Sequence, residues 1–434
     1  MNKHANTIKE TLMTLISKMS ENPAPYVKNP GKDFIRNRKL PFEIVVKLLI
    51  SMGGNSICKE LLEDSDYDLS TATTSAFVQQ RDKIKPFAFE FLFHKFTEAH
   101  KALQKHRGYR LYAVDGSDLL IATNANDSST HIQSNPNERG YNSLHLNAMY
   151  DLCNKVYVDA YVQPIRQLNE KRALTDMVDR SAVKDKVIVI ADRNYESYNI
   201  FAHIERKDWN YVIRVKDLGS TGILSGLKLP SGGEFDVCIH RILTRKQTKD
   251  VKANPDVYKF MPSNQVFDFL PLRTEQFYPI SLRIVRIKID DFYETLITNL
   301  NALDFPPCEL KEIYRMRWGI ETSFRELKYS VGLTNFHAKK QEYIVQEIFA
   351  RLIMYNFAEM ITSHVVISKD DTKHTYQVNF TVAIHICRRF LRSNAPPLDV
   401  EALIRKNILP IRVGRKANRS MRSKSSTSFL YRVS

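Results

Sequence analysis

A short apolar run at residues 186–192 (KVIVIAD) constrains the fold more than any other stretch. Its side chains are apolar at nearly every position, which is typical of a strand covered on both faces. The flanking sequence supplies its neighbours in the order three strands, helix, strand, helix, strand. The strands are predicted at residues 109–117, 144–151, 155–162, 186–192 and 210–217, and the helices at residues 173–180 and 195–206. This order predicts an α/β fold, a mixed sheet with helices on its faces.

Two aspartates stand where predicted buried strands end. Asp115 follows YRLYAV, and Asp192 follows KVIVIA. Ligands of open α/β sheets bind at this rim, so we expect neighbouring strands to bring the two carboxylates together. The alternatives are a turn at Asp115 and a helix N-cap at Asp192. Asp118 is interpreted as a cap or turn residue.

A third acid lies in YRMRWGIETSFRELK, residues 314–328, which we predict to be one helix. At about 100° per residue, Tyr314, Arg317, Glu321 and Lys328 share one face. A carboxylate flanked by an aromatic hydroxyl and two cations suits a magnesium-like ion beside phosphate oxygens. Taken alone, the spacing also fits a solvated ladder of i, i+4 charges.

The three acids form a ligand set of a particular kind. Asp115, Asp192 and Glu321 come from separate elements, and carboxylate oxygens suit hard divalent ions. Two such ions are what phosphodiester chemistry uses, one at the attacking oxygen and one at the leaving oxygen. Arg317, Lys328 and Tyr314 would hold the phosphates on either side of the cut.

The charge balance points to a polyanionic partner. The chain has 64 Lys and Arg against 48 Asp and Glu, a formal net charge of +16. Nucleic acid is the first candidate and an anionic membrane surface the second. No apolar run approaches the ~18 residues of a spanning helix, and the start lacks the apolar core of a signal peptide. The five cysteines show no zinc spacing, which favours reduced structural thiols in a cytosolic protein.

Composition changes divide the 434 residues into five predicted segments. They are a helical DNA-binding domain (1–106), the first part of the catalytic core (107–217), a β-rich insertion (218–305), the second part of the core with C-terminal helices (306–395) and a basic tail (396–434). The two long helices predicted at 341–363 and 378–392 either cover the sheet or pair with a second subunit. The tail from residue 412 on is rich in Arg, Lys and Ser, and we expect it to be mobile.

Two sets of polar residues are weaker candidates for nucleic-acid contact. A helix-turn-helix in the N-terminal region would present Ser75, Gln79, Gln80 and Arg81 to DNA. Cations of the insertion either line a nucleic-acid channel or face solvent. They are Arg241, Arg245, Lys246, Arg283, Arg286 and Lys288.

The spacing Tyr, two residues, Arg, three residues, Glu, six residues, Lys resembles the YREK signature of DDE transposases of bacterial insertion sequences. Tyr314, Arg317, Glu321 and Lys328 match it without a gap. AVDGS, VIVIADRNYES, LITNL and GLTNFH resemble other motifs of that family. The resemblance covers roughly residues 105–345.

The resemblance implies a ribonuclease-H-like core interrupted by a β insertion. It implies that Asp115, Asp192 and Glu321 bind two Mg²⁺ ions, with Mn²⁺ as a substitute. The reaction would be hydrolysis at the ends of the element, which frees 3′ hydroxyls, followed by their attack on target DNA. The N-terminal region would bind terminal inverted repeats, and a homodimer would hold both ends in the bacterial cytoplasm, at the nucleoid. The alternative is an inactive, transposase-derived DNA-binding regulator.

The insertion departs from some members of that family, which use a Trp there to hold a flipped base during hairpin formation. Here the two Trp residues are Trp209 and Trp318, both outside the insertion. Trp318 either stacks on a base or packs against the sheet. Hairpin formation is left open, and candidate substitutes for the missing Trp are Phe235, Phe260 and Phe277. His337 is expected to be structural.

Overall fold

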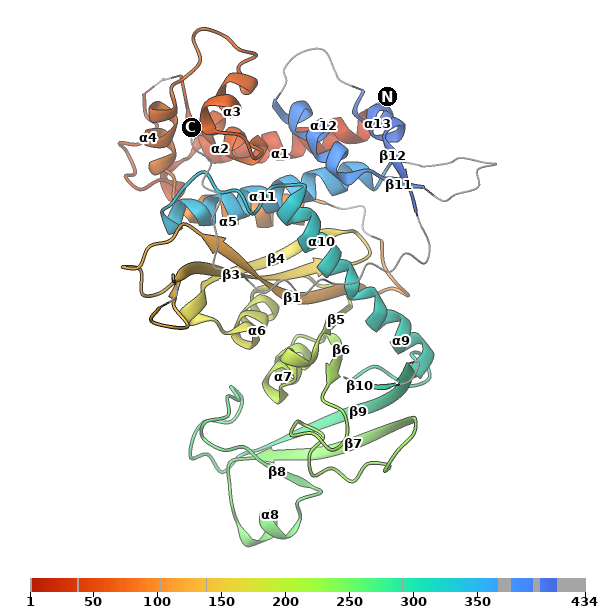
Figure 1. Cartoon of the computed structure of the whole chain (residues 1–434). Helices are drawn as coiled ribbons and strands as arrows, with labels where there is room; N and C mark the ends of the chain where they lie inside the picture. Colours follow the sequence, from red (N-terminus) through yellow and green to blue (C-terminus); the bar gives the residue numbers. More distant parts are fainter. Residues whose placement is uncertain are drawn as a thin grey trace.

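One mixed sheet runs through the middle of the molecule (Figure 1). The computed structural model describes residues 2–36, 39–100, 104–137, 139–289, 292–365, 376–392 and 399–411, and within them this sheet has ten strands. The strands are β1 (Arg110–Ile121), β2 (His131–Ile132), β3 (Tyr141–Asp151), β4 (Val156–Pro164), β5 (Val187–Ala191), β6 (Asn210–Val215), β7 (Phe235–Thr244), β8 (Tyr258–Phe260), β9 (Phe277–Ile289) and β10 (Phe292–Thr298).

The helices lie above, beside and below this sheet in Figure 1. They are α1 (Lys3–Glu21), α2 (Phe42–Ser51), α3 (Ile57–Asp64), α4 (Thr74–Asp82), α5 (Pro86–Glu98), α6 (Glu170–Arg180), α7 (Tyr198–Arg206), α8 (Lys249–Ala253), α9 (Pro307–Met316), α10 (Trp318–Tyr329), α11 (Gln341–Thr362), α12 (Phe380–Arg392) and α13 (Val400–Lys406). No helix in this described part of the chain is long and apolar enough to cross a bilayer.

The centre of the sheet has the strand order β4, β3, β1, β5, β6. β1 pairs antiparallel with β3 and parallel with β5, and β5 pairs parallel with β6. All five residues of β5 are buried, as the apolar run predicts. This is the arrangement of a ribonuclease-H-like core, so the predicted fold class is confirmed.

Strands from residues 218–305 continue the same sheet. β10 pairs antiparallel with β6, β9 with β10, and β7 with β9. Backbone groups on the outer edge of β6 are thereby paired by β10. The β content of the insertion is as predicted, and its strands extend the core sheet. The division into five segments stays a prediction.

Helices cover both faces of the sheet, because alternate residues of β1 point to opposite sides. Tyr112 and Val114 belong to the apolar cluster formed with α6 and α7. Leu111 packs on the other face, in the cluster that contains Leu310 and Ile313 of α9. Ala113 faces the larger cluster that includes α10 and α11.

α11 joins the N-terminal helices to the core. It is buried over nearly its whole length and packs against α2, α5, α12 and β4. Figure 1 shows it lying beside α5 over the sheet, with α1 to α4 on its far side. Of the two alternatives for this helix, covering the sheet is therefore the one observed.

The helix-turn-helix interpretation is wrong for two of its four residues. Arg81 is 2% exposed and Gln80 is 8% exposed, so both point into the protein. The Arg81 guanidinium forms a 2.9 Å ion pair with Glu347 of α11 and a 2.9 Å hydrogen bond to Gln346. Ser75 and Gln79 of α4 are exposed. Sequence spacing placed Arg81 on the same polar face, but packing against α11 buries it.

The cations of the insertion are also bound by protein groups. Arg241 and Arg283 are 4% exposed, so for them both the channel and the solvent-facing alternatives are wrong. Arg283 pairs with Asp236 at 2.7 Å, and Arg286 pairs with Asp217 at 2.8 Å. Arg245 donates to the carbonyl of Leu270 at 2.7 Å. Carboxylates and backbone carbonyls of the protein thus bind these arginines, whose partners the sequence left unassigned.

Of the predicted basic tail, residues 400–406 form α13, and residues 408–410 form β12 (Ile408–Pro410), which pairs with β11 (Tyr376–Val378). Residues 412–434, for which mobility is predicted, lie outside the described residues.

Candidate active site

Asp115 lies in the middle of β1, on the face that α10 covers, so the predicted strand end at Asp115 and the alternative of a turn are both wrong. Its Oδ1 accepts a 2.8 Å hydrogen bond from the backbone N–H of Gly116. Burial, together with the negative charges of Asp192 and Glu321, raises the pKa of Asp115 from 3.8 to about 6. The Gly116 N–H and the Arg317 guanidinium oppose this rise in pKa. Asp192 and Glu321, which come from separate elements, therefore each lie within electrostatic range of Asp115.

Arg317 connects two of these acids. Its Nη2 lies 3.0 Å from Oε1 of Glu321, and its Nη1 lies 3.9 Å from Oδ2 of Asp115. Because both contacts are made by one guanidinium, the two carboxylates lie on either side of a single group. Arg317 itself is 7% exposed. The solvated-ladder alternative for Arg317 and Glu321 is therefore wrong.

The helix predicted over residues 314–328 has a junction at Arg317, where α9 ends and α10 begins. Arg317 keeps helical dihedral angles, φ −49° and ψ −33°. Its backbone N–H bonds to the carbonyl of Tyr314, three residues back, and Ile320 bonds to Arg317 in the same way. The tighter turn leaves Glu321 one turn after Arg317, so the predicted i, i+4 contact forms.

Asp192 directly follows β5, which pairs with β1 through Ile190 and Ala113. Its Oδ1 accepts a 2.9 Å hydrogen bond from the N–H of Asn194, so the predicted N-cap is also present, on the 3₁₀ turn Arg193–Tyr195. A capping carboxylate has further acceptor capacity. The cap therefore does not exclude Asp192 from binding a ligand.

The donor set around Asp115 fits a hard divalent cation. Its ligand atoms are carboxylate oxygens, which Mg²⁺ and Mn²⁺ prefer. Tyr195 is 1% exposed, and its hydroxyl has no hydrogen-bond partner among the residues that the structure describes. Burial and the charges of Glu170, Asp115 and Asp192 raise the pKa of Tyr195. The Tyr195 hydroxyl is thus a buried polar group within electrostatic range of Asp115 and Asp192. As they stand, no three His, Cys, Asp or Glu side chains in the described ranges are gathered closely enough to hold an ion.

The remaining signature residues divide into buried and exposed members. Tyr314 is 5% exposed, and the Arg317 guanidinium lies 5.7 Å from the centre of its ring. Trp318 is 52% exposed and also contacts Arg317, at 5.4 Å, so the alternative of core packing is wrong for Trp318. Lys328 donates to the backbone carbonyl of Asp118 at 3.1 Å, which ties the end of α10 to β1.

Comparison with known proteins identifies the family. A family model described as "Transposase DDE domain" matches residues 106–357, more than half of the chain. The chain belongs to this family of DDE transposases. A cryo-EM structure of a piggyBac transposase synaptic complex with hairpin DNA matches with a TM-score of 0.42 and 13% identity, covering 96% of this chain and 85% of that chain. The comparison with curated proteins gives no match.

Sequence reasoning missed a second polar group of this transposase. Asp118 lies inside β1 and is neither a cap nor a turn residue, so that interpretation is wrong. Its carboxylate contacts His145 of β3 at 2.7 Å, and His145 contacts Glu170 of α6 at 3.1 Å. The signal available was the alternation of β1 and β3, but the register that pairs Asp118 with His145 is a property of the folded sheet.

His337 is structural, as predicted. Its backbone N–H and its Nδ1 both contact Oε2 of Glu347, at 2.9 and 3.2 Å, and its Nε2 lies 2.9 Å from the carbonyl oxygen of Asn55. It joins the loop after α10 to α11 and to the N-terminal helices.

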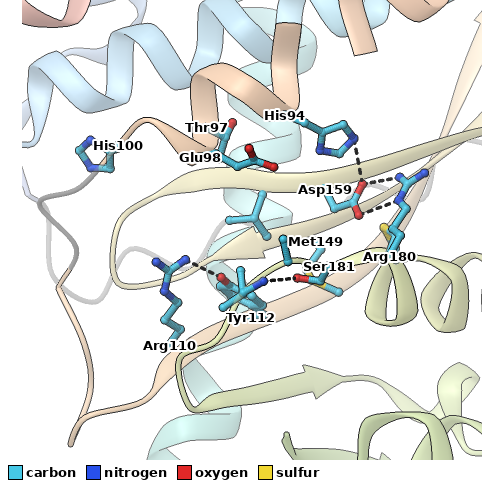
Figure 2. Close-up of a pocket in the computed structure, with 14 residues that line it drawn as sticks. His94, Thr97, Glu98, His100, Arg110, Tyr112, Met149, Asp159, Arg180 and Ser181 are labelled. Atoms are coloured by element: carbon cyan, nitrogen blue, oxygen red, sulfur yellow. Dashed lines mark hydrogen bonds and ion pairs between the residues drawn. The ribbon is translucent and has the colours of Figure 1, made fainter. Parts of the chain in front are cut away.

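A separate cavity of about 290 Å³ lies between α5, α6 and the sheet, and Figure 2 shows its lining. Arg110 contacts the hydroxyl of Tyr112 there at 2.8 Å and pairs with Asp185 at 2.7 Å. Arg180 pairs with Asp159. None of the predicted site residues of the transposase lines this cavity, and its two arginines are neutralised by neighbouring acids.

Proposed function

We propose that this transposase cleaves the ends of an insertion sequence and joins them to target DNA. Asp115, Asp192 and Glu321 would bind two divalent ions, Mg²⁺ or Mn²⁺. The enzyme would act on terminal inverted repeats and on target DNA, as a homodimer, in the bacterial cytoplasm at the nucleoid. The alternative, a DNA-binding regulator without activity, predicts binding without cleavage.

The observation that supports this proposal is the electrostatic link of Asp115 to the other two acids. Asp192 and Glu321 both raise the pKa of Asp115, and Arg317 contacts Asp115 and Glu321 together. Burying like charges side by side costs free energy, so an arrangement of this kind is typical of a functional site. The family match over residues 106–357 supports the proposed reaction class.

Each residue has a role that follows from its chemistry. The bound ions would activate the attacking oxygen and stabilise the leaving one. Arg317 presents a planar guanidinium that suits phosphate oxygens, and Lys328 adds a cation at the end of the same helix. Tyr314 is buried under Arg317 and acts by supporting it. Trp318, half exposed, is placed to stack on a base.

The test is cleavage of linear DNA that carries the two ends of the element, in the presence of Mg²⁺ and a target plasmid. We expect 3′ hydroxyl ends and joined products from the wild-type protein, and neither from Asp192→Ala. Glu98→Ala is a matched control, because Glu98 is an exposed acid paired with Lys95 of its own helix. Activity that survives Asp192→Ala would refute the assignment. Binding to the ends without Mg²⁺-dependent cutting would favour the regulator.

A further inference from the structure

Directly behind Asp115, on the other face of β1, lies a histidine held between two carboxylates. Nδ1 of His145 lies 2.7 Å from Oδ1 of Asp118, and Nε2 lies 3.1 Å from Oε1 of Glu170. The His145 side chain is 6% exposed, whereas Asp118 and Glu170 are partly exposed. We refer to Asp118, His145 and Glu170 as the histidine bridge. It joins β1, β3 and the first residue of α6.

The bridge packs on the residue that follows Asp115. A Cβ at Gly116 would lie 2.2 Å from Nε2 of His145 and 2.6 Å from Oε1 of Glu170, so a side chain here would displace both groups. The same Gly116 donates its N–H to Oδ1 of Asp115 at 2.8 Å. The imidazole therefore lies against the peptide unit that orients the Asp115 carboxylate.

Both ends of the bridge are anchored. Asn169 caps α6 by accepting a 2.9 Å hydrogen bond from the N–H of Arg172, and its own N–H donates to Gln163 of β4 at 3.2 Å. This fixes the first turn of α6 and with it Glu170. At the other end, the backbone carbonyl of Asp118 accepts the 3.1 Å bond from Lys328 of α10. The bridge thus connects the α6 face of the sheet with the helix that carries Glu321.

Charge supports this interpretation. Burial alone would lower the pKa of His145, but Asp118 and Glu170 outweigh it and raise the pKa to about 9. At neutral pH the imidazole then carries a positive charge: Nδ1 donates a hydrogen bond to Asp118, and Nε2 lies within ion-pair distance of Glu170. A single positive charge offsets two negative ones close to a site that already contains three acids.

We propose that His145 is a positioning residue for the metal site: by bridging Asp118 and Glu170 over Gly116, it fixes Asp115 in the orientation that binds a divalent ion. This rests on the proposed function, because it assumes that Asp115 is a metal ligand. Residues that orient metal ligands typically contribute 10–100-fold to metal affinity.

His203 is a matched control, because it is also a buried histidine between two carboxylates. It is 7% exposed and lies between Asp179 and Asp268, with 2.9 Å contacts at both ring nitrogens. It joins α6, α7 and the insertion, and neither of its two partners is a predicted metal ligand. Replacing either histidine breaks a buried bridge, but only His145 lies behind Asp115.

The experiment measures Mn²⁺ binding to the full chain from the electron paramagnetic resonance signal of free Mn²⁺. His145→Asn keeps an amide near the position of Nδ1, and His145→Gln keeps one near Nε2, so each preserves one arm of the bridge. We expect both to weaken Mn²⁺ binding by roughly tenfold or more. His203→Asn should stay within about twofold of the wild type. Glu170→Gln is the second variant in case the His145 variants do not fold. It preserves the shape of the side chain, removes one charge of the bridge, and should also weaken Mn²⁺ binding.

Asp192→Ala separates this inference from the proposed function. If Asp192→Ala weakens Mn²⁺ binding while the bridge variants bind like the wild type, the positioning role is wrong and the metal site stands. The positioning role is also wrong if His203→Asn weakens binding as much as His145→Asn, since the effect is then a general loss of packing. If Asp192→Ala itself binds Mn²⁺ normally, the metal site is wrong, and the positioning role falls with it.

Discussion

Replacing Asp115 with Asn should stabilise the metal-free protein, although it removes a proposed metal ligand. The pKa of Asp115 is raised from 3.8 to about 6, first by burial and then by Asp192 and Glu321. A carboxyl group with a raised pKa contributes stability only while it is protonated, and that contribution is lost as the pH rises through the folded-state pKa. At pH 8 wild-type Asp115 is ionised at a cost in folding free energy that Asn avoids.

The size of the effect follows from the shift. Two pKa units correspond to about 3 kcal/mol, which is an upper value. The Asp115 side chain is 27% exposed, so water screens part of the repulsion, and we expect about 1–2 kcal/mol. The linkage relation makes the gain at pH 5 about half of the gain at pH 8, because Asp115 is then mostly protonated in the folded state.

The assay is thermal denaturation in a chelating buffer at both pH values, followed by circular dichroism. We expect the midpoint of Asp115→Asn to lie roughly 2–5 °C above the wild type at pH 8, with a smaller difference at pH 5. Added Mg²⁺ should raise the wild-type midpoint and leave that of the variant nearly unchanged, because Asp115→Asn would remove a carboxylate from the proposed metal site.

Asp217→Asn is the matched control with the opposite sign. Asp217 pairs with Arg286 and accepts from Thr295, and these hydrogen bonds lower its pKa. Its loss should therefore destabilise the protein at pH 8. The reasoning about repulsion among the acids is refuted if Asp115→Asn is less stable than the wild type at pH 8, or if its gain is larger at pH 5.

Three further predictions concern single residues. Glu347→Gln should cost about 3 kcal/mol in urea denaturation at pH 7, because it leaves a buried arginine without its partner, whereas exposed Glu342→Gln should cost less than about 1 kcal/mol. Arg317→Lys should slow end cleavage roughly tenfold, because an ammonium group cannot contact both carboxylates as a guanidinium does; unchanged cleavage would count against the bridging role. Tyr195→Phe should melt at the same temperature as the wild type or slightly above it, because the lost hydroxyl has no partner among the described residues, and a clear drop in the melting temperature would show a bond to that hydroxyl.

Local patterns predicted the elements of this protein well. The apolar run at residues 186–192 became β5, and the two strands on either side of the turn at 152–154 became β3 and β4. The contact between Arg317 and Glu321 follows from helical geometry, although residues 314–328 form two helices that meet at Arg317. Asp192 follows the end of β5 as predicted, but the sequence placed Asp115 at a strand end, whereas β1 continues to Ile121.

What each polar group binds was decided only by the tertiary structure. Arg81 and Arg283 have the sequence context of surface cations, yet each is buried against an acid from a distant segment. His145 gave no signal by itself, because its partners come from two other elements brought together by strand register and by the start of α6. Periodicity depends on near neighbours in the chain and is readable from the sequence. The choice of an ionic partner depends on which elements pack together. The interactions that stabilise a buried ion pair between distant segments form only after those elements have packed.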